Sequence, residues 1–258
     1  MNALLIDIGN QRIKLAVATS PRRVNPLPPL PSTIAAEELK AKTGRIVRRH
    51  KPGACVIASV VPPVTRRILA TIRSQFPGKG VFVLNFASFA KLMKTAVKPR
   101  PEPGADRLAD VLALKALCPL PACVIGAGTA ITVNVVDKNG VFRGGAILPN
   151  TGLQLAALRQ KTARLGVVRN LDARAHAIGT DTRSAVTAGV MRGAECAVEG
   201  LVRDMQAELK MPFKTIIVTG GHGERFAARL KARGLKAEYD AAFTLRGLAW
   251  FADAQQPR

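Results

Sequence analysis

The first residues in the chain with potential for chemistry are an aspartate and a glycine at the end of an apolar run. Segment 4–17 reads LLIDIGNQRIKLAV, and Gly9-Asn10 forms the turn because both residue types tolerate a positive φ. Backbone N–H groups at such a turn can approach phosphate oxygens, and a carboxylate can hold Mg²⁺ or its waters. The segment therefore predicts a phosphate-binding hairpin, with Asp7 as the candidate magnesium ligand.

A second segment, 123–136, repeats this form as CVIGAGTAITVNVV. Aligning the two segments puts Gly9 on Gly128 and Asn10 on Thr129. Either segment alone is more simply an ordinary hairpin with a glycine turn, since short motifs have low specificity. As a pair, two such hairpins facing each other could hold the phosphates of one nucleotide, and this is our interpretation.

The third candidate group is an acid at the start of a helix. Prolines extend segment 98–103, and a helix is predicted from Gly104 with Asp106 in its first turn. A carboxylate at this position stabilises the helix through the macrodipole by about 0.3 to 1 kcal/mol, which is the structural alternative. Chemically, it could accept a proton from a substrate hydroxyl. Arg107 could pair with a substrate carboxylate, or lie at the surface.

The elements that position these groups alternate between strands and helices. Segment 21–31 is predicted to be a surface loop, because its prolines lack the backbone donor, and Ser32 or Thr33 is predicted to cap the next helix. Further elements expected in the first half are a helix to about His50, a strand at 54–61, a helix from Pro62 to Phe76 and a strand at 80–84. These lengths predict right-handed crossovers onto a parallel sheet, the pattern of a ribonuclease H-like half-domain.

The second half is predicted to restate the first. The expected elements are a strand at 140–149, a helix after Asn150, a long helix at 184–209, a strand at 215–223 ending in a glycine-rich turn, and an apolar helix at 243–251 packed on the sheet. Thr182 could cap the long helix or offer its hydroxyl to a ligand.

Composition bounds the class of protein. The chain has 258 residues, of which 48% are hydrophobic, so it can form globular cores. No apolar run approaches the roughly 18 to 20 residues of a membrane helix, and the chain begins with a strand rather than a signal sequence, so we expect a cytoplasmic protein. The four cysteines form no C-x-x-C pair and are expected to be reduced core residues, and the three scattered histidines suggest no zinc site.

The net charge of +22 raises the question of polyanion binding. The basic residues are dispersed, and with one Trp and one Tyr the chain offers no aromatic platform for stacking bases. We therefore expect a solvated basic surface rather than specific nucleic-acid binding.

Taken together, these motifs resemble the type III pantothenate kinase family, the CoaX or Baf-like family. The motifs that carry the resemblance occur in order along nearly the whole chain: Asp7-x-Gly-Asn with Lys14, Gly-Ala-Asp-Arg at 104–107, Gly-Thr-Ala at 128–130, Gly144-Gly145 before Pro149, Thr182 with Gly189, and Thr219-Gly-Gly at 219–221.

The resemblance implies an α/β protein of the actin-like ATPase superfold, with two ribonuclease H-like domains, 1–118 and 119–258, around a nucleotide cleft. It implies a homodimer that phosphorylates pantothenate with ATP to give 4′-phosphopantothenate, the first step of coenzyme A synthesis. Mg²⁺ and a monovalent cation, K⁺ or NH₄⁺, are the cofactors it implies.

The resemblance also assigns roles to residues. Residues expected to contact ATP are Asp7, Ile8, Gly9, Asn10, Gln11, Arg12, Ile13, Lys14 and Thr129. Residues expected to bind pantothenate are Gly104, Ala105, Asp106, Arg107 and Thr182, with Asp106 as the proton acceptor. Asp7 is the expected Mg²⁺ ligand, directly or through water.

Two positions depart from the family pattern. Gly126 stands where the family has the aspartate expected to hold the monovalent cation, and Asn134 stands where a second acid is usual. These departures leave open a rival interpretation, a catalytically impaired, nucleotide-binding regulatory protein of the same fold. A sugar or acetate kinase of the same superfold is a further alternative, disfavoured by the more specific Gly-Ala-Asp-Arg motif.

Overall fold

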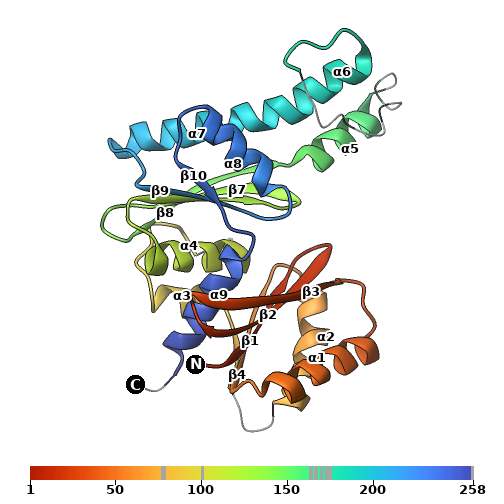
Figure 1. The fold of residues 1–258 in the computed structure, drawn as a ribbon, viewed down its shortest axis with the longest axis vertical. Helices are drawn as coiled ribbons and strands as arrows, with labels where there is room; N and C mark the ends of the chain where they lie inside the picture. Colours follow the sequence, from red (N-terminus) through yellow and green to blue (C-terminus); the bar gives the residue numbers. More distant parts are fainter. Residues whose placement is uncertain are drawn as a thin grey trace.

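Both predicted hairpins lie within five-stranded sheets. The computed structural model describes residues 1–76, 80–99, 102–162, 165, 168, 171 and 176–256. The first hairpin consists of β1 (Ala3–Ile8) and β2 (Arg12–Ser20), in a sheet of order β3-β2-β1-β4-β5. The second consists of β6 (Ala122–Ala127) and β7 (Ala130–Val136), in a sheet of order β10-β9-β6-β7-β8. The two sheets and their helices are shown in Figure 1.

In the first sheet, the strand–helix–strand prediction is confirmed. Strand β1 pairs in parallel with β4 (Ala54–Ser59), and β4 pairs in parallel with β5 (Gly80–Val83). Helices α1 (Ala36–His50) and α2 (Pro62–Gln75) cover one face, where Leu4, Ile6 and Ile8 are buried against them. Because side chains alternate along a strand, Leu5 and Asp7 point to the opposite face.

The second sheet has the same plan. Strand β6 pairs in parallel with β9 (Thr215–Thr219), β9 pairs in parallel with β10 (Ala237–Tyr239), and β7 pairs antiparallel with β8 (Phe142–Pro149). Helices α7 (Gly193–Leu209) and α8 (Gly223–Ala232) bury Cys123 and Ile125 on one face. By the same alternation, Val124 and Gly126 point to the other face.

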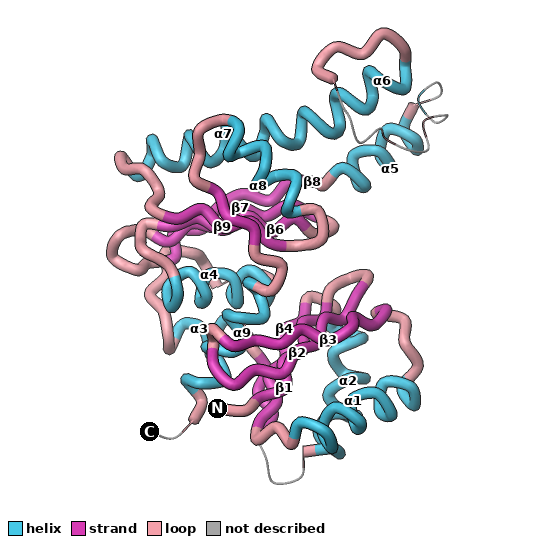
Figure 2. The backbone as a smooth tube through the Cα atoms, viewed as in Figure 1, coloured by secondary structure: helices cyan, strands magenta, loops and turns pink. Residues whose placement is uncertain are grey.

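Two helices fill the space between the sheets. Helix α4 (Ala105–Leu117) packs against α9 (Phe243–Ala254), and their apolar residues share one core with Leu5 of the first sheet and Val124 of the second. Figure 2 shows this arrangement, with α1 and α2 on one outer face and α7 and α8 on the other. The division of the chain at residue 118 stays a prediction, and α9 contacts β1, β2 and β4 of the first sheet.

Shorter helices complete the described part of the chain. These are α3 (Phe86–Ala90), α5 (Thr151–Lys161) and α6 (Thr182–Thr187), the last continuing through a π-helical segment, 188–192, into α7. The predicted extended stretch 98–103 lies partly outside the described residues. Within the described ranges, no helix combines the length and apolar character needed to cross a bilayer.

One predicted loop is instead a strand. Segment Arg23–Pro31 forms β3, which pairs with β2 alone at the edge of the first sheet. An edge strand tolerates proline because one of its sides needs no backbone donor. The pairing shifts register between Ile13 and Leu15, which accommodates Pro28-Pro29. The loop prediction was wrong because proline excludes a central strand, but not an edge strand.

The predicted cap of α1 was wrong, and Thr182 does not cap its helix, which was one of the two roles considered for it. Helix α1 starts after Ala35 without a side-chain cap, and the Ser32 hydroxyl donates instead to the Gly9 carbonyl at 2.7 Å. At α6 the cap is Asp181, whose carboxylate accepts from the Ser184 backbone N–H at 3.0 Å. An aspartate one residue earlier competes well for this position, because carboxylates are among the best N-caps.

The cysteine prediction held only in part. Cys55 and Cys123 are buried free thiols, whose pKa values burial raises. Cys196 is free but exposed, and Cys118 is half-buried. These two thiols are therefore not core residues.

Close approach of α4 and α9 depends on a glycine. A Cβ atom at Gly247 would lie 1.8 Å from the carbonyl oxygen of Ala109. We predict that Gly247→Ala lowers the free energy of unfolding by about 1 to 3 kcal/mol, or more, because the helices must separate. Denaturant unfolding measures this change. The control is Gly200→Ala in α7, where a Cβ meets nothing within 4 Å and should stabilise by about 0.5 to 1 kcal/mol. Equal effects of the two substitutions would contradict the packing argument.

Candidate functional site

A cavity of about 630 Å³ brings the two hairpin turns to one place. Its described lining comes from both sheets and the turns that follow their strands, and from α4, α5 and α9: Asp7, Gly9, Asn10, Gln11, Arg12, Lys14, Val60, Asp106, Asp110, Gly126, Ala127, Gly128, Thr129, Ala130, Thr132, Asn150, Gly152, Leu153, Thr219, Gly220, Gly221, His222 and Thr244. The twin turns therefore border a single cleft, which we call the central cleft.

The first turn is fixed by backbone and serine hydrogen bonds. The Gly9 N–H donates to the Arg12 carbonyl at 3.0 Å, and the Ser32 N–H donates to the Gln11 carbonyl at 3.1 Å. Contrary to the sequence prediction, neither Gly9 nor Asn10 has a positive φ. The glycine provides space instead, since a Cβ there would lie 3.3 Å from the Arg12 carbonyl oxygen.

The second turn is held in a similar way. The Gly128 N–H donates to the Ala130 carbonyl at 3.1 Å, and the Asn150 side-chain amide donates to the Gly128 carbonyl at 2.6 Å. The glycine-rich turn after β9 lies beside it, where Gly220 has a φ of +93° and a Cβ would lie 2.5 Å from the Ala127 carbonyl oxygen. Only glycine fits that position without strain.

Asp7 and Lys14 face each other across the first hairpin. They are register partners on β1 and β2, and the Lys14 Nζ lies 3.6 Å from Asp7 Oδ2. Burial raises the pKa of the Asp7 carboxyl, and Asp106 adds to the increase, whereas Lys14 lowers it. The lysine therefore compensates a buried carboxylate at the floor of the cleft.

Asp106 lies in the first turn of α4, as predicted. Its Oδ1 accepts from the Arg107 backbone N–H at 2.8 Å. A Cβ at Gly104 would lie 2.6 Å from the same oxygen, so glycine there leaves room for the carboxylate to fold over the helix start. Asp106 lines the central cleft.

The side chain of Arg107 is held by a buried amide. Its Nε donates to Asn134 Oδ1 at 2.7 Å, and Asn134 is fully buried on β7. Burial lowers the pKa of Arg107, while Asp106 and Asp110 raise it. The neutral amide thus orients the guanidinium without neutralising its charge.

Sequence reasoning missed a second acid of α4. Asp110 is 4% exposed, lines the cleft, and accepts from the Thr244 hydroxyl at 2.7 Å. Burial raises the pKa of Asp110 to about 8; Asp106 and Asp7 also raise it, and Thr244 and Lys14 lower it. The sequence could have indicated Asp110, because residues four apart on a helix share a face and Asp106 was already expected in the cleft.

The comparisons with known proteins place this chain in a family. A family model described as type III pantothenate kinase matches residues 3–204. The chain belongs to the type III pantothenate kinase family. A protein named type III pantothenate kinase from Roseiflexus sp. (strain RS-1) is 34% identical to this chain, and the match covers 95% of this chain and 96% of the relative. A protein of the same name from Maricaulis maris (strain MCS10) is 33% identical, and the match covers 76% of this chain and 73% of the relative.

Solved structures agree on the fold. The crystal structure of a conserved putative Baf family transcriptional activator from Campylobacter jejuni matches with a TM-score of 0.63 at 19% identity, covering 97% of this chain and 98% of that one. A putative 2-dehydro-3-deoxygalactonokinase from Sinorhizobium meliloti matches with a TM-score of 0.62 at 15% identity, covering 99% and 100%. The predicted actin-like ATPase fold of the type III pantothenate kinases is thereby confirmed.

The family's expected contact residues are not all gathered in the central cleft. The side chains of Ile8 and Ile13 are buried in the core of the first sheet, so only their backbone groups are available to a ligand. Gly104, Ala105 and Arg107 are close in sequence to Asp106 but do not line the cavity. The roles assigned to all these residues stay predictions.

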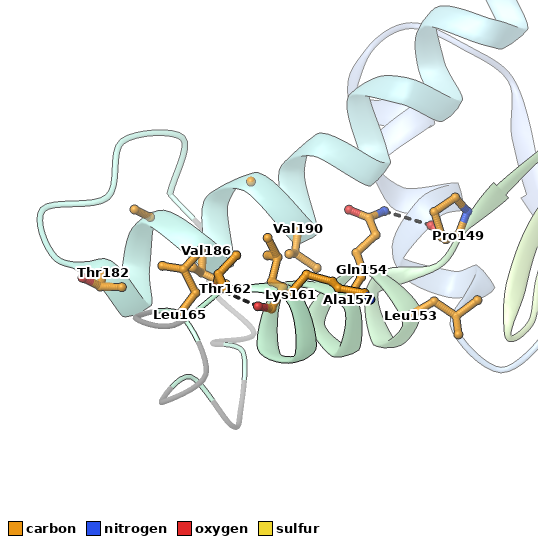
Figure 3. A pocket seen from close by; sticks show the side chains of 13 residues that line it. Pro149, Leu153, Gln154, Ala157, Lys161, Thr162, Leu165, Thr182, Val186 and Val190 are labelled. Carbon is orange, nitrogen blue, oxygen red and sulfur yellow. Dashed lines mark hydrogen bonds between the residues drawn. The ribbon is translucent and has the colours of Figure 1, made fainter.

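Thr182 lies elsewhere, in an apolar groove of about 840 Å³ between α5 and α6. Figure 3 shows this groove, with Leu165, Val186 and Val190 along it and Thr182 toward one end. Leu153 lines both the groove and the central cleft, so the two cavities adjoin at that residue.

A kinase of this family implies a divalent metal ion, and the cleft offers few ligands for one. Among the described residues, no group of three or more His, Cys, Asp or Glu side chains is placed to hold a metal ion. Mg²⁺ is commonly bound through one or two carboxylates, with water and substrate phosphates as the other ligands. Asp7 in the central cleft fits that mode of binding.

The raised pKa of Asp110 gives a pH prediction. The unfolded carboxyl loses its proton near pH 4, whereas the folded one keeps it to about pH 8. This group therefore lowers the free energy of unfolding as pH rises between those values, by up to about 1.4 kcal/mol per pH unit. Asp110→Asn should remove that component, so the stability of the variant relative to wild type should increase from pH 5 to pH 8.

Urea unfolding in buffer free of metal cations measures this difference. Asp204→Asn, at an exposed position on α7, is the matched control and should follow wild type at both pH values. Parallel pH profiles for Asp110→Asn and wild type would contradict the prediction.

Proposed function

We propose that the protein transfers the γ-phosphoryl group of ATP to the 4′-hydroxyl of pantothenate. The products are 4′-phosphopantothenate and ADP, in the first step of coenzyme A synthesis. The observation that carries the proposal is the single cleft lined by both hairpin turns and by Asp106 at the head of α4, in a chain of this family.

ATP binding is supported by the two turns. Phosphoryl transfer depends mainly on positioning and charge stabilisation, which backbone N–H groups and a lysine can supply. Asn10 and Thr129 add an amide and a hydroxyl at equivalent points of the turns, and Lys14 adds a positive charge near Asp7. When bound at Asp7, Mg²⁺ would neutralise charge on the phosphate oxygens.

Asp106 is our candidate proton acceptor. A hydroxyl that attacks phosphorus must lose its proton, and a carboxylate at the cleft can accept it as the bond forms. The backbone N–H of Arg107 occupies Oδ1 and orients the group. The guanidinium of Arg107, held by neutral Asn134, retains a charge suited to the carboxylate of pantothenate.

Asp106→Asn tests this assignment. The amide keeps the size of the side chain but cannot accept the proton, so we expect the turnover number for phosphopantothenate formation to fall about 10²- to 10⁴-fold. Nucleotide affinity, measured by calorimetry, should change little. Asp204→Asn is the control with full turnover.

Two outcomes would count against the proposal. Wild-type turnover retained by Asp106→Asn would remove this residue from catalysis. ATP binding by the wild-type protein without product, under any monovalent cation, would favour a regulatory role. Sugars that compete with pantothenate would indicate a different kinase specificity.

We also propose that the protein is a homodimer and works in the cytoplasm, where ATP is available. Two large apolar side chains are exposed: Ile147 by 61% and Ile178 by 83%. Ile147 lies on β8, an edge strand of the second sheet, which leaves one side of that strand unpaired among the described strands. Exposed apolar residues beside an open edge favour association with a second copy.

Light scattering in solution tests the dimer. We expect a mass of about twice the 27.4 kDa of one chain. Ile147→Asp should shift the protein toward the monomer because it would bury a charge, whereas Ile147→Val should not. A monomeric wild type at micromolar concentration, or a dimer unaffected by the aspartate, would contradict this arrangement.

A further inference from the structure

A row of polar groups surrounds the space left by Gly126. On the second sheet, Gly126 pairs with Thr132 of β7 and with Thr219 of β9. Residues directly opposite on neighbouring strands project to the same face, so the two threonines flank the glycine. A Cβ at Gly126 would lie 2.7 Å from Thr132 Oγ1 and 3.6 Å from Asp110 Oδ2. The absent side chain thus leaves a space bordered by a hydroxyl and a carboxylate.

The Thr219 hydroxyl is an independent sign of a ligand. Thr219 is 3% exposed and lines the central cleft, and its Oγ1 has no hydrogen-bond partner within the part of the chain that the structure describes. Buried hydroxyl groups are normally satisfied, because burial without a partner is unfavourable. A buried hydroxyl oxygen with no partner, on the same face of the sheet as Gly126, is available as a cation ligand.

Asp110 also has ligand capacity in reserve. Its Oδ1 accepts from Thr244, whereas Oδ2 accepts no hydrogen bond from the described residues. Lys14 is engaged with Asp7 at 3.6 Å. The charged groups that act on Asp110 are Asp106 and Arg107 on its own helix and Asp7 and Lys14 from the first sheet. Neither base forms an ion pair with Asp110 among the described residues, because Lys14 is paired with Asp7 and the Arg107 Nε donates to Asn134.

The charge of the cleft contrasts with that of the whole chain. The chain has 39 Lys and Arg against 17 Asp and Glu, yet the cleft lining has three acids, Asp7, Asp106 and Asp110, and two bases, Arg12 and Lys14. Arg12 is exposed at the turn. The cleft lining therefore has more acidic than basic side chains in a strongly basic protein, which favours a bound cation.

We propose that Asp110 Oδ2 and the hydroxyls of Thr132 and Thr219 bind a monovalent cation of the size of K⁺. The carboxylate that resembles the family's cation ligand would then come from α4 instead of from position 126 on β6. A single carboxylate among neutral hydroxyls balances one positive charge, whereas Mg²⁺ demands near-octahedral geometry and dehydrates reluctantly. The inference rests on the proposed function for the role of the ion beside the phosphates, but not for ion binding itself.

Burial favours cation binding at this place. Asp110 is 4% exposed and Thr219 is 3% exposed, and the exclusion of water strengthens the attraction between a carboxylate and a cation.

The experiment measures ion binding by the ligand-free protein. Thermal unfolding is followed by fluorescence of Trp250, the single tryptophan, at pH 8 in KCl or in N-methylglucamine chloride of equal ionic strength. At ten times its dissociation constant, K⁺ should raise the Tm of wild type by about 3 to 6 °C over the organic cation. Asp110→Asn should lose this shift, and Asp204→Asn should keep it.

Two further variants test the hydroxyl ligand and the space for the ion. Thr219→Val removes one oxygen at nearly constant shape and should reduce the K⁺ shift, and it serves as the test if Asp110→Asn does not fold. Gly126→Ala introduces a methyl group into the space and should also reduce the shift. A K⁺ shift that persists in Asp110→Asn and in Thr219→Val, or its absence from wild type at 200 mM KCl, would overturn the proposal.

Phosphopantothenate formation in the same two salts distinguishes this proposal from the proposed function. A wild type that turns over equally in KCl and in N-methylglucamine chloride is a kinase without the inferred ion requirement, which overturns the role of the ion beside the phosphates. If the Tm of wild type depends on K⁺ but no product forms, the ion site is supported and the kinase assignment is contradicted.

Discussion

The packing of α4 between two sheets is the constraint on which the central cleft depends. Its apolar residues are buried against both sheets and against α9, where Gly247 allows the helices to approach closely. A helix held on every apolar side cannot rotate without exposing core residues, so its polar positions are fixed in direction. Asp106 and Asp110, one turn apart, therefore both line the cleft between the hairpin turns.

The two hairpin turns that border the cleft are also held in place. The two turns are held by short hydrogen bonds to Ser32 and Asn150, side chains that come from outside the hairpins. Their N–H groups are thus pre-arranged on strands that belong to different sheets. A ligand that spans both turns would bridge the two halves of the molecule. Groups that are fixed in position before the ligand binds can stabilise its phosphates without further rearrangement.

Much of the fold could be predicted because its signals are local. The hairpins, the buried strand β4 and the start of α4 follow from apolar runs, glycine turns and proline positions within short segments. The strand β3 could not be predicted in this way. Whether proline is tolerated depends on whether a strand lies at the edge of a sheet, and that is a property of the tertiary arrangement.

The residues of the candidate site could be predicted only where a short local motif marks them. Asp7 and Asp106 stand out beside glycines, and both line the cleft. The inferred role of Asp110 depends on the space beside Gly126, a residue on another element. Only the packing of α4 on β6 brings the two residues together. Thr182 is the first residue of α6, and it lines the groove with residues of α5 but not the central cleft.

The placement of α9 has a consequence for biosynthesis. This helix covers a face of the first sheet, yet it is translated after every strand of both sheets. While the ribosome is still making the second half, the side of β1 that carries Leu5 lacks part of its apolar cover. The nascent first half therefore exposes apolar surface that chaperones can bind until residues 243–254 emerge from the exit tunnel.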